Sequence, residues 1–297
     1  MDRVLEYEIP SEYDGANITT VLKQHFKIST NLIKDLKKYK EGIQVNGEHK
    51  RVVDLAAKGD ILKITIRDTA SENIVPTNIP LDIVYEDEDV LVINKPPNMP
   101  THPSMGNYEN SLANGVMYYY KSKGEERVFR AVNRLDKDTS GLMAVAKNSY
   151  IHARLGEEIQ KKELKRKYMC IVCGDVERDG TVDAPIRRAD GSVINRIVAP
   201  DGQRAVTHYR VVKRYGKYTL LEMELETGRT HQIRVHMAYI GHPLVGDWLY
   251  GTEDHNIAKR QMLHSCYLCF THPITGQIME FKDEMAEDMR AFIEKLS

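Results

Sequence analysis

The chain has 297 residues, 41% of them hydrophobic and 29% charged, with a formal net charge of −1 at pH 7. The length leaves room for two domains, and the composition is ordinary for a soluble protein. No stretch reaches the roughly 20 apolar residues of a membrane span, and the start MDRVLEYEIPSEYDG lacks the apolar core of a secretory signal. We therefore expect a cytoplasmic protein with no membrane partner. The near-neutral charge excludes global attraction to nucleic acid, so any such binding would depend on local basic patches.

Residues 1–70 predict a small independent domain. The pattern favours a helix over residues 18–26 and a second helix that Ser29 or Thr30 can cap. A strand over 43–45 then enters an Asn46-Gly47 hairpin turn, and another strand follows over 61–66. This order resembles the S4 fold, a small α+β RNA-binding module, although a packed accessory domain remains an alternative. In the S4 fold the second helix and the hairpin face RNA, and the resemblance therefore implies phosphate contacts from Lys34, Lys37, Lys38 and Lys40.

Residues 71–80 read as a linker, because they are polar and contain Pro76 and Pro80. Beyond them, residues 81–297 predict a second domain of many short strands and few helices. The strands are expected at 82–85, 90–94, 131–135, 142–147, 166–173, 204–213, 217–226, 262–270 and 277–281, and the helices at 110–121, 149–163, 231–240 and 284–295. Apolar and polar residues alternate along 218–226, which indicates antiparallel pairing. We expect an α+β fold with a mixed, mainly antiparallel sheet and helices on its faces.

The four cysteines form two C-x-x-C pairs, Cys170 with Cys173 and Cys266 with Cys269. Such pairs can bind zinc. Both pairs lie in apolar, strand-like runs, however, where residues three apart point to opposite faces and cannot chelate one ion. We therefore expect buried free cysteines and no metal site.

Residues 131–148 read AVNRLDKDTSGLMAVAKN and contain the most informative motif. A strand that ends in Arg134-Leu135-Asp136 and turns through Gly141 into a second strand would present Asp136 at a tight corner, where rigid scaffolds often place catalytic groups. An ordinary turn of Asp, Thr, Ser and Gly is the competing interpretation.

Four motifs in order resolve this ambiguity by resemblance. Arg-Leu-Asp-x-x-Thr-Ser-Gly resembles the active-site motif of the RluA-type pseudouridine synthases, which isomerise uridine in RNA to its C-glycoside. Three further segments resemble the other motifs of the family: residues 81–96, residues 165–174, and residues 227–247 with the core Thr-Gly-Arg-Thr-His-Gln-Ile-Arg. The likeness spans roughly residues 80–282, and four ordered motifs are far more specific than one. One departure is Asn133, where most members of the family have His.

The resemblance implies the roles of three residues. Asp136 would be the catalytic aspartate, acting by covalent addition to the sugar or by proton abstraction, and Arg234 would be its counter-charge. Tyr168 would stack on the uracil base and handle a proton. By the same resemblance, Arg134 would displace the target nucleotide and fill its place in the base stack. Arg229, His231 and Ile233 would line the path of the RNA.

The predicted function is therefore an RNA pseudouridine synthase, an isomerase that needs no cofactor. Ribosomal RNA is the first choice of substrate, with transfer RNA as the alternative, and we expect a monomer. Two other classes remain: a non-catalytic RNA-binding protein that keeps the fold, and a hydrolase with an Asp/His pair. Asp136, Tyr168 and Arg234 are all present, which argues against the first. The second would need a nucleophile elbow or a metal motif, and neither is evident. His231, His236 and His242 do not fall on one helical face, which argues against a zinc triad.

Overall fold

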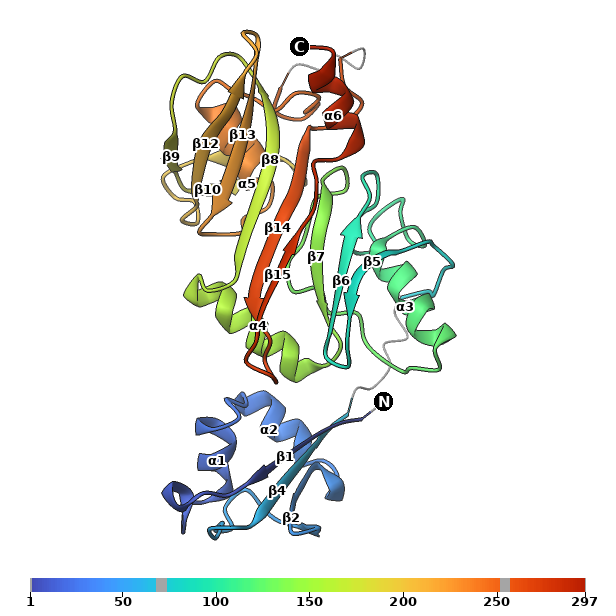
Figure 1. The fold of residues 1–297 in the computed structure, drawn as a ribbon, viewed down its shortest axis with the longest axis vertical. Helices are drawn as coiled ribbons and strands as arrows, with labels where there is room; N and C mark the ends of the chain where they lie inside the picture. The colour runs from blue at the N-terminus through green and yellow to red at the C-terminus, as the bar shows by residue number, and fades with distance from the viewer. Residues whose placement is uncertain (1, 68–73, 252–256, 297) are drawn as a thin grey trace.

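The computed structural model describes residues 2–67, 74–251 and 257–296. Residues 3–66 form a small α+β domain, drawn in blue in Figure 1, at one end of the larger domain. Its four strands are antiparallel in the order β1-β4-β2-β3, and the buried faces of two helices cover them. The elements are β1 (Arg3–Glu8), α1 (Ile18–Gln24), α2 (Thr30–Leu36), β2 (Ile43–Val45), β3 (Glu48–His49) and β4 (Ile61–Ile66), with 3-10 turns at Ser11–Tyr13 and Lys40–Gly42.

Local sequence explains these elements. The side chains of Asn17 and Ser29 accept hydrogen bonds from the backbone N–H groups of Thr20 and Leu32, which caps α1 and α2. Asn46 and Gly47 both have positive φ, as the tight hairpin between β2 and β3 requires. Strand β1 was not predicted, and the expected first helix ends two residues early.

The larger domain is built on a nine-stranded sheet in the order β5-β6-β7-β14-β8-β13-β12-β9, with β15 paired to β14. Only β7 and β14 are paired in parallel among the described residues, so the mixed, mainly antiparallel α+β prediction is confirmed. The strands are β5 (Asp82–Glu86), β6 (Val90–Lys95), β7 (Ser140–Ala146), β8 (Lys165–Cys173), β9 (Gly180–Asp183), β12 (Val206–Arg214), β13 (Tyr218–Leu225), β14 (Leu263–Thr271) and β15 (Ile278–Lys282).

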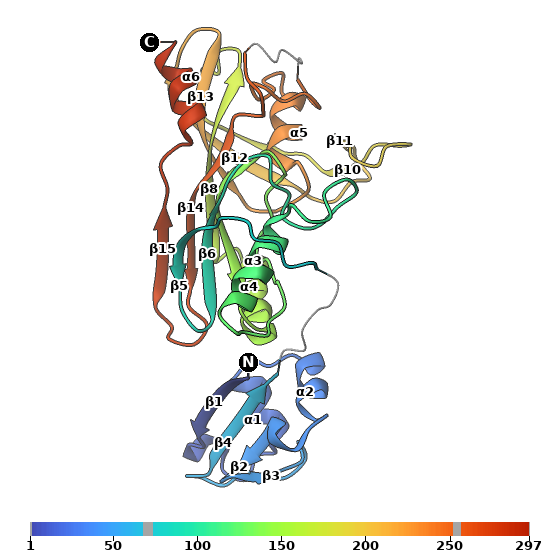
Figure 2. The ribbon, with the colours of Figure 1, turned by 90° about the vertical axis from the view of Figure 1, so that its right-hand side faces the viewer.

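Helices lie on the faces of this sheet. Figure 2 shows α3, α4 and α5 on one side of the sheet, together with the projecting hairpin of β10 and β11, and α6 near the opposite side. Their bounds are α3 (Leu112–Ser122), α4 (Ser149–Lys161), β10 (Ile186–Arg188), β11 (Arg196–Val198), α5 (Gln232–Tyr239) and α6 (Glu287–Glu294). No helix in the described part of the chain is both long and apolar enough to cross a membrane.

One prediction about this domain needs correction. The strand expected over 131–135 is absent, because only Ala131 pairs, through an isolated bridge to Val145, and the rest of the segment is loop. Residues 71–73 of the predicted linker lie outside the described residues. Residues 74–80 run against α3, where Asn114 donates a hydrogen bond to the carbonyl of Val75 and accepts one at its own carbonyl from the N–H of Thr77.

The turn between β5 and β6 joins the two domains. Arg3 of β1 donates two hydrogen bonds to Asp89, both 2.9 Å long, and Asp89 is 2% exposed. Asn148, which caps α4, donates a third hydrogen bond to the same carboxylate. One apolar cluster contains buried side chains of both domains. The small domain is therefore docked on the large one and shares part of its core.

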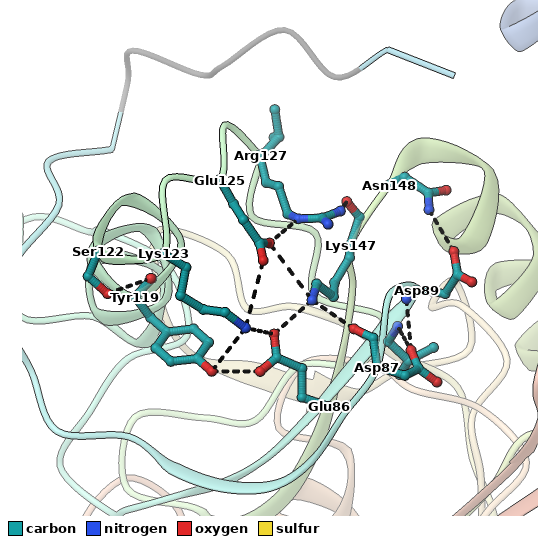
Figure 3. A network of polar contacts seen from close by, with 12 residues as sticks. Glu86, Asp87, Asp89, Tyr119, Ser122, Lys123, Glu125, Arg127, Lys147 and Asn148 are labelled. Atoms are coloured by element: carbon teal, nitrogen blue, oxygen red, sulfur yellow. Dashed lines mark hydrogen bonds and ion pairs between the residues drawn. The ribbon is translucent and has the colours of Figure 1, made fainter. Parts of the chain in front are cut away.

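A polar network surrounds this turn (Figure 3). The Nζ atom of Lys147, which is 3% exposed, donates to Glu86 Oε1 and to the carbonyl of Asp87, both at 2.7 Å. Tyr119 of α3 and Lys123, which follows the helix directly, also donate to Glu86. Burial alone would raise the pKa of Glu86, but these three donors lower it to about 2. The carboxylate is therefore ionised at neutral pH and fixes α3 to the sheet.

Candidate active site

A cavity of about 840 Å³ opens on the side of the sheet that carries α4 and α5. It lies among the loop 131–139, strand β8, the end of α4 and the start of α5. Two carboxylates line it, those of Asp136 and Glu226. Six cationic side chains line it among the described residues: Arg134, Lys162, Arg166, Arg196, Arg229 and Arg234. This local excess of positive charge contrasts with the net charge of −1 for the chain and suits an anionic ligand.

Asp136 begins a tight turn before β7, in which the N–H of Thr139 donates to the Asp136 carbonyl. The turn enters β7 through Gly141, whose φ is 110°. A Cβ atom at this position would lie 2.3 Å from the carbonyl oxygen of Ser265. Glycine is therefore required where β7 meets β14 in parallel pairing. The prediction of a tight corner is confirmed, although a loop rather than a strand leads into it.

Lys95 at the end of β6 braces this turn from one side. It is fully buried, and its Nζ donates to the carbonyl oxygens of Pro96, Met99 and Lys137 at 2.8, 2.8 and 3.0 Å. Three acceptors match the three N–H bonds of an ammonium group, whereas burial lowers the pKa of Lys95 to about 7. The end of β6 therefore supports the turn through this side chain.

Residues 260–264 brace the turn from the other side. Arg260 Nη1 donates to the carbonyl of Asp138 at 3.0 Å, and His264 Nδ1 lies 2.9 Å from the hydroxyl of Ser140. Asp288 of α6 holds Arg260 through two hydrogen bonds. Together with Lys95, these contacts fix the backbone on the C-terminal side of Asp136.

Arg234 on α5 contacts two carboxylates. Its Nη1 donates to Asp136 at 3.1 Å, as predicted, while its Nε and Nη2 donate to Asp247 at 2.7 and 2.8 Å. Asp247 is fully buried, and Asp136 keeps 24% of its side chain exposed toward the cavity. Burial would lower the pKa of Arg234, but the two carboxylates raise it. The guanidinium therefore stays charged and places its positive charge beside the carboxylate of Asp136.

His231 lies just before α5 rather than on it, in the left-handed region with φ 58°. Its Nε2 is 3.9 Å from Asp136, and its Nδ1 is 2.8 Å from the hydroxyl of Tyr250. Burial lowers the pKa of His231, so the neutral form is favoured at neutral pH. The predicted helix 231–240 thus begins one residue late, yet His231 and Arg234 both reach Asp136.

Tyr168 on β8 is 4% exposed and lines the cavity floor. Burial raises the pKa of its hydroxyl, which keeps the phenol protonated. Ile233, 3% exposed, and the outer side chains of Arg134 and Arg229 also line the cavity. All the site residues predicted in the larger domain therefore meet at one cavity.

The remaining predicted residues lie elsewhere. Lys34, Lys37 and Lys38 are exposed on α2 and just after it, in the small domain, and none lines the cavity. Lys38 pairs with Asp35 at 2.6 Å.

The four cysteines are free, but only Cys170 is buried, so the expectation of buried thiols is wrong for the other three. Across the described ranges, no group of three or more potential ligands could hold a metal ion.

The comparisons with known proteins agree with this geometry. The sequence profile of the RNA pseudouridylate synthase family matches residues 89–239. A Bacillus subtilis protein named as the uncharacterized RNA pseudouridine synthase YjbO is 44% identical over 268 residues, which cover 90% of this chain and 94% of the relative. The chain belongs to the RNA pseudouridylate synthase family. The ribosomal large subunit pseudouridine synthase D of Haemophilus influenzae is a further relative of this synthase, 38% identical over 99% of this chain and 94% of its own length.

Solved structures share the fold of this synthase. Human RNA Pseudouridylate Synthase Domain Containing 4 superposes with a TM-score of 0.59 at 22% identity, over 72% of this chain and 92% of that one. Human RNA Pseudouridylate Synthase Domain Containing 1 gives 0.57 at 22% identity, over 74% and 96%.

Two residues of the candidate site were not predicted from the sequence. Asp247 ends the third motif and Tyr250 follows it, and the centre of the Tyr250 ring lies 5.2 Å from the Arg234 guanidinium carbon. An aspartate directly after Gly246 in a matched motif was the available signal for Asp247. Asn133, at the departure from the family pattern, accepts a hydrogen bond from the N–H of Ala144 and so ties the Asp136 loop to β7. Its side chain therefore has a structural role at this position.

Proposed function

We propose that this synthase isomerises uridine in large-subunit ribosomal RNA and that Asp136 is its catalytic carboxylate. The observation that carries the proposal is the placement of Asp136. The carboxylate faces a cation-lined cavity and accepts one hydrogen bond from Arg234, whose other contacts go to Asp247. The choice of ribosomal RNA is supported by the relatives named for the large ribosomal subunit.

The reaction breaks the N1–C1′ bond of uridine, rotates the uracil and forms a C5–C1′ bond. C5 loses its proton and N1 takes up a proton, so the product is an isomer of uridine. The reaction transfers no net electrons. An ionised Asp136 can add to C1′ of the sugar, or it can abstract a proton and start an elimination, and both routes need a carboxylate that burial does not neutralise. The hydrogen bond from Arg234 meets this need.

Tyr168 and Ile233 provide an apolar surface for the freed uracil between the two steps. The buried phenol of Tyr168 offers a flat ring for stacking, and its hydroxyl stays protonated. Arg134 is exposed at the rim beside Asp136, which suits a planar cation that replaces an extruded base. Arg229 and His231 complete the wall of the cavity.

The small domain is proposed to be an S4-like RNA-binding module in residues 1–70, with Lys34, Lys37 and Lys38 as phosphate contacts. The two helices and the hairpin support this assignment. We further propose that the synthase acts as a monomer in the cytoplasm, in keeping with the relatives named for the large ribosomal subunit.

The test uses large-subunit ribosomal RNA labelled with tritium at C5 of uridine, since isomerisation releases this proton to water. The wild type should release tritium, and Asp136→Asn should lose activity by at least about 10³-fold, because the amide has neither charge nor basicity. Asp138→Asn makes the same change two residues away with a side chain outside the cavity, and it should stay active. Wild-type turnover by Asp136→Asn would disprove the role of Asp136.

The choice of RNA has its own test. Pseudouridines are mapped in total RNA from cells with and without the gene. If the cells without the gene lost pseudouridines from transfer RNA alone, the isomerase activity would stand, but ribosomal RNA would be refuted as the substrate.

A further inference from the structure

We propose that Arg166 binds a backbone phosphate of the RNA next to the target uridine. This inference rests on the proposed function, because the ligand is taken to be RNA. Arg166 lies on β8 two residues before Tyr168, and both side chains line the cavity. Residues two apart on a strand point to the same face and lie roughly 7 Å apart. A group bound at Arg166 would therefore neighbour a uracil on Tyr168.

The first observation is burial without a partner. Arg166 is 7% exposed, and its side chain makes no hydrogen bond or ion pair with any residue that the structure describes. Its Nε atom is fully buried and unsatisfied. An unpaired buried charge costs free energy of folding, and buried charges in proteins are generally paired with an opposite charge. We therefore expect the guanidinium to bind an anion that is not part of this chain.

The second observation concerns the nearby carboxylates, which are already engaged. Asp136 accepts from Arg234. Glu226, the other carboxylate of the cavity, pairs with Lys162 at 2.5 Å and with His208 at 3.0 Å. Neither side chain neutralises Arg166, although both line the same cavity.

The third observation concerns the chain that covers the guanidinium. Gly228 lies over Arg166, and a Cβ atom there would come within 3.3 Å of Nη1. The main chain can approach this closely because residue 228 has no side chain. The main chain at Gly228 leaves the side chain of Arg166 facing the cavity, which Gly228 also lines.

A phosphate fits this environment better than a uracil carbonyl. It carries the missing negative charge, and two of its oxygens match the planar fork of a guanidinium. A carbonyl would accept one hydrogen bond and leave the charge uncompensated. The two ligands differ in an observable way, because only a phosphate contact releases counterions and steepens the salt dependence of binding.

The test measures binding of a short single-stranded oligouridylate and thermal unfolding of the full chain. Arg166→Met should weaken binding by roughly 10–100-fold and lower the log–log salt slope by about 0.7. It should also raise or preserve the melting temperature, because an unpaired buried charge is removed. Arg166→Lys should keep the salt slope and recover only part of the affinity, since lysine lacks the fork.

The control is Arg178→Met, the same change at an exposed arginine outside the cavity. It should leave the affinity, the slope and the melting temperature unchanged. A fall in affinity for Arg166→Met with an unchanged slope would overturn the phosphate assignment in favour of a base contact. A lower melting temperature with unchanged binding would show a structural role instead. If the wild type binds RNA through Arg166 but isomerises none, the proposed function fails and this inference stands.

Discussion

Arg234 and Arg3 hold buried aspartates in the same way at two distant places in the molecule. Each donates through Nε and Nη2 to one carboxylate, Arg234 to Asp247 and Arg3 to Asp89. The two arrangements differ at the third nitrogen. Nη1 of Arg234 reaches Asp136 at the cavity, whereas Nη1 of Arg3 reaches Glu88, whose side chain is 58% exposed. The same arrangement therefore holds a carboxylate at the cavity in one place and joins two domains in the other.

The largest effect should come from Arg234→Ala, which leaves Asp247 fully buried without its counter-charge. Breaking a buried pair from one side costs about 3–5 kcal/mol, and activity should also be lost. Adding Asp247→Asn should recover part of this stability, because asparagine keeps an acceptor for the N–H groups of Leu249 and Tyr250. Adding Asp136→Ala should recover little, because Asp247 would remain charged.

Urea unfolding of the single and the two double variants checks this prediction. If Asp136→Ala restored more stability than Asp247→Asn did, Asp136 rather than Asp247 would be the main partner of Arg234, and the parallel with Arg3 and Asp89 would be wrong.

A smaller effect should follow Arg3→Ala. Asp89 would keep only Asn148 as a side-chain partner, but Arg3 is 17% exposed, and water can replace it in part. We expect a loss of about 1–3 kcal/mol, and Asp89→Asn should reverse part of it. Lys63→Ala, at a more exposed ion pair of the same domain, serves as the control and should cost under about 1 kcal/mol. Equal melting temperatures for Arg3→Ala and Lys63→Ala would show that the junction adds no stability.

The same junction leads to an expectation for a chain that lacks residues 1–70. That fragment should fold and remain active, with weaker RNA binding, but it should melt below the full chain because Asp89 no longer has Arg3 as a partner. Asp89→Asn in the fragment should raise its melting temperature, and no change would argue against an unpaired charge.

The smallest effect on stability is expected for the exposed lysines of the small domain. Lys34→Ala, Lys37→Ala and Lys38→Ala should barely change unfolding. Removing one lysine–phosphate interaction should lower the log–log salt slope of RNA binding by roughly 0.7–0.9. Lys282→Ala, at a side chain 72% exposed in the larger domain, is the control. If the variant that combines all three lysine substitutions kept the salt slope of the wild type, the small domain would not contact RNA.

The sequence predicted what depends on local pattern. The alternation along Tyr218–Leu225 gave a strand because one face is buried, and the Asn46-Gly47 turn required its two positive φ angles. The strand predicted over 131–135 was wrong. Apart from the isolated bridge of Ala131 to Val145, the residues of this segment lie in a loop, where their apolar side chains pack without strand pairing.

Long-range pairing was only partly accessible. Arg234 and Asp136 were matched across 98 positions by family motifs alone. The sequence contains no signal that Arg3 pairs with Asp89, because each residue alone has the pattern of a solvent-exposed charge.

The backbone that follows Asp136 has little freedom to adapt. Lys95, Arg260 and His264 hold the residues after it from two sides, and Asp288 secures Arg260 from the C-terminal helix. A group fixed before its substrate arrives does not need to reorganise during the reaction. With Asp136 in its proposed role, the deformation that brings uridine to the carboxylate falls on the RNA, and opening of the local RNA structure becomes part of substrate choice.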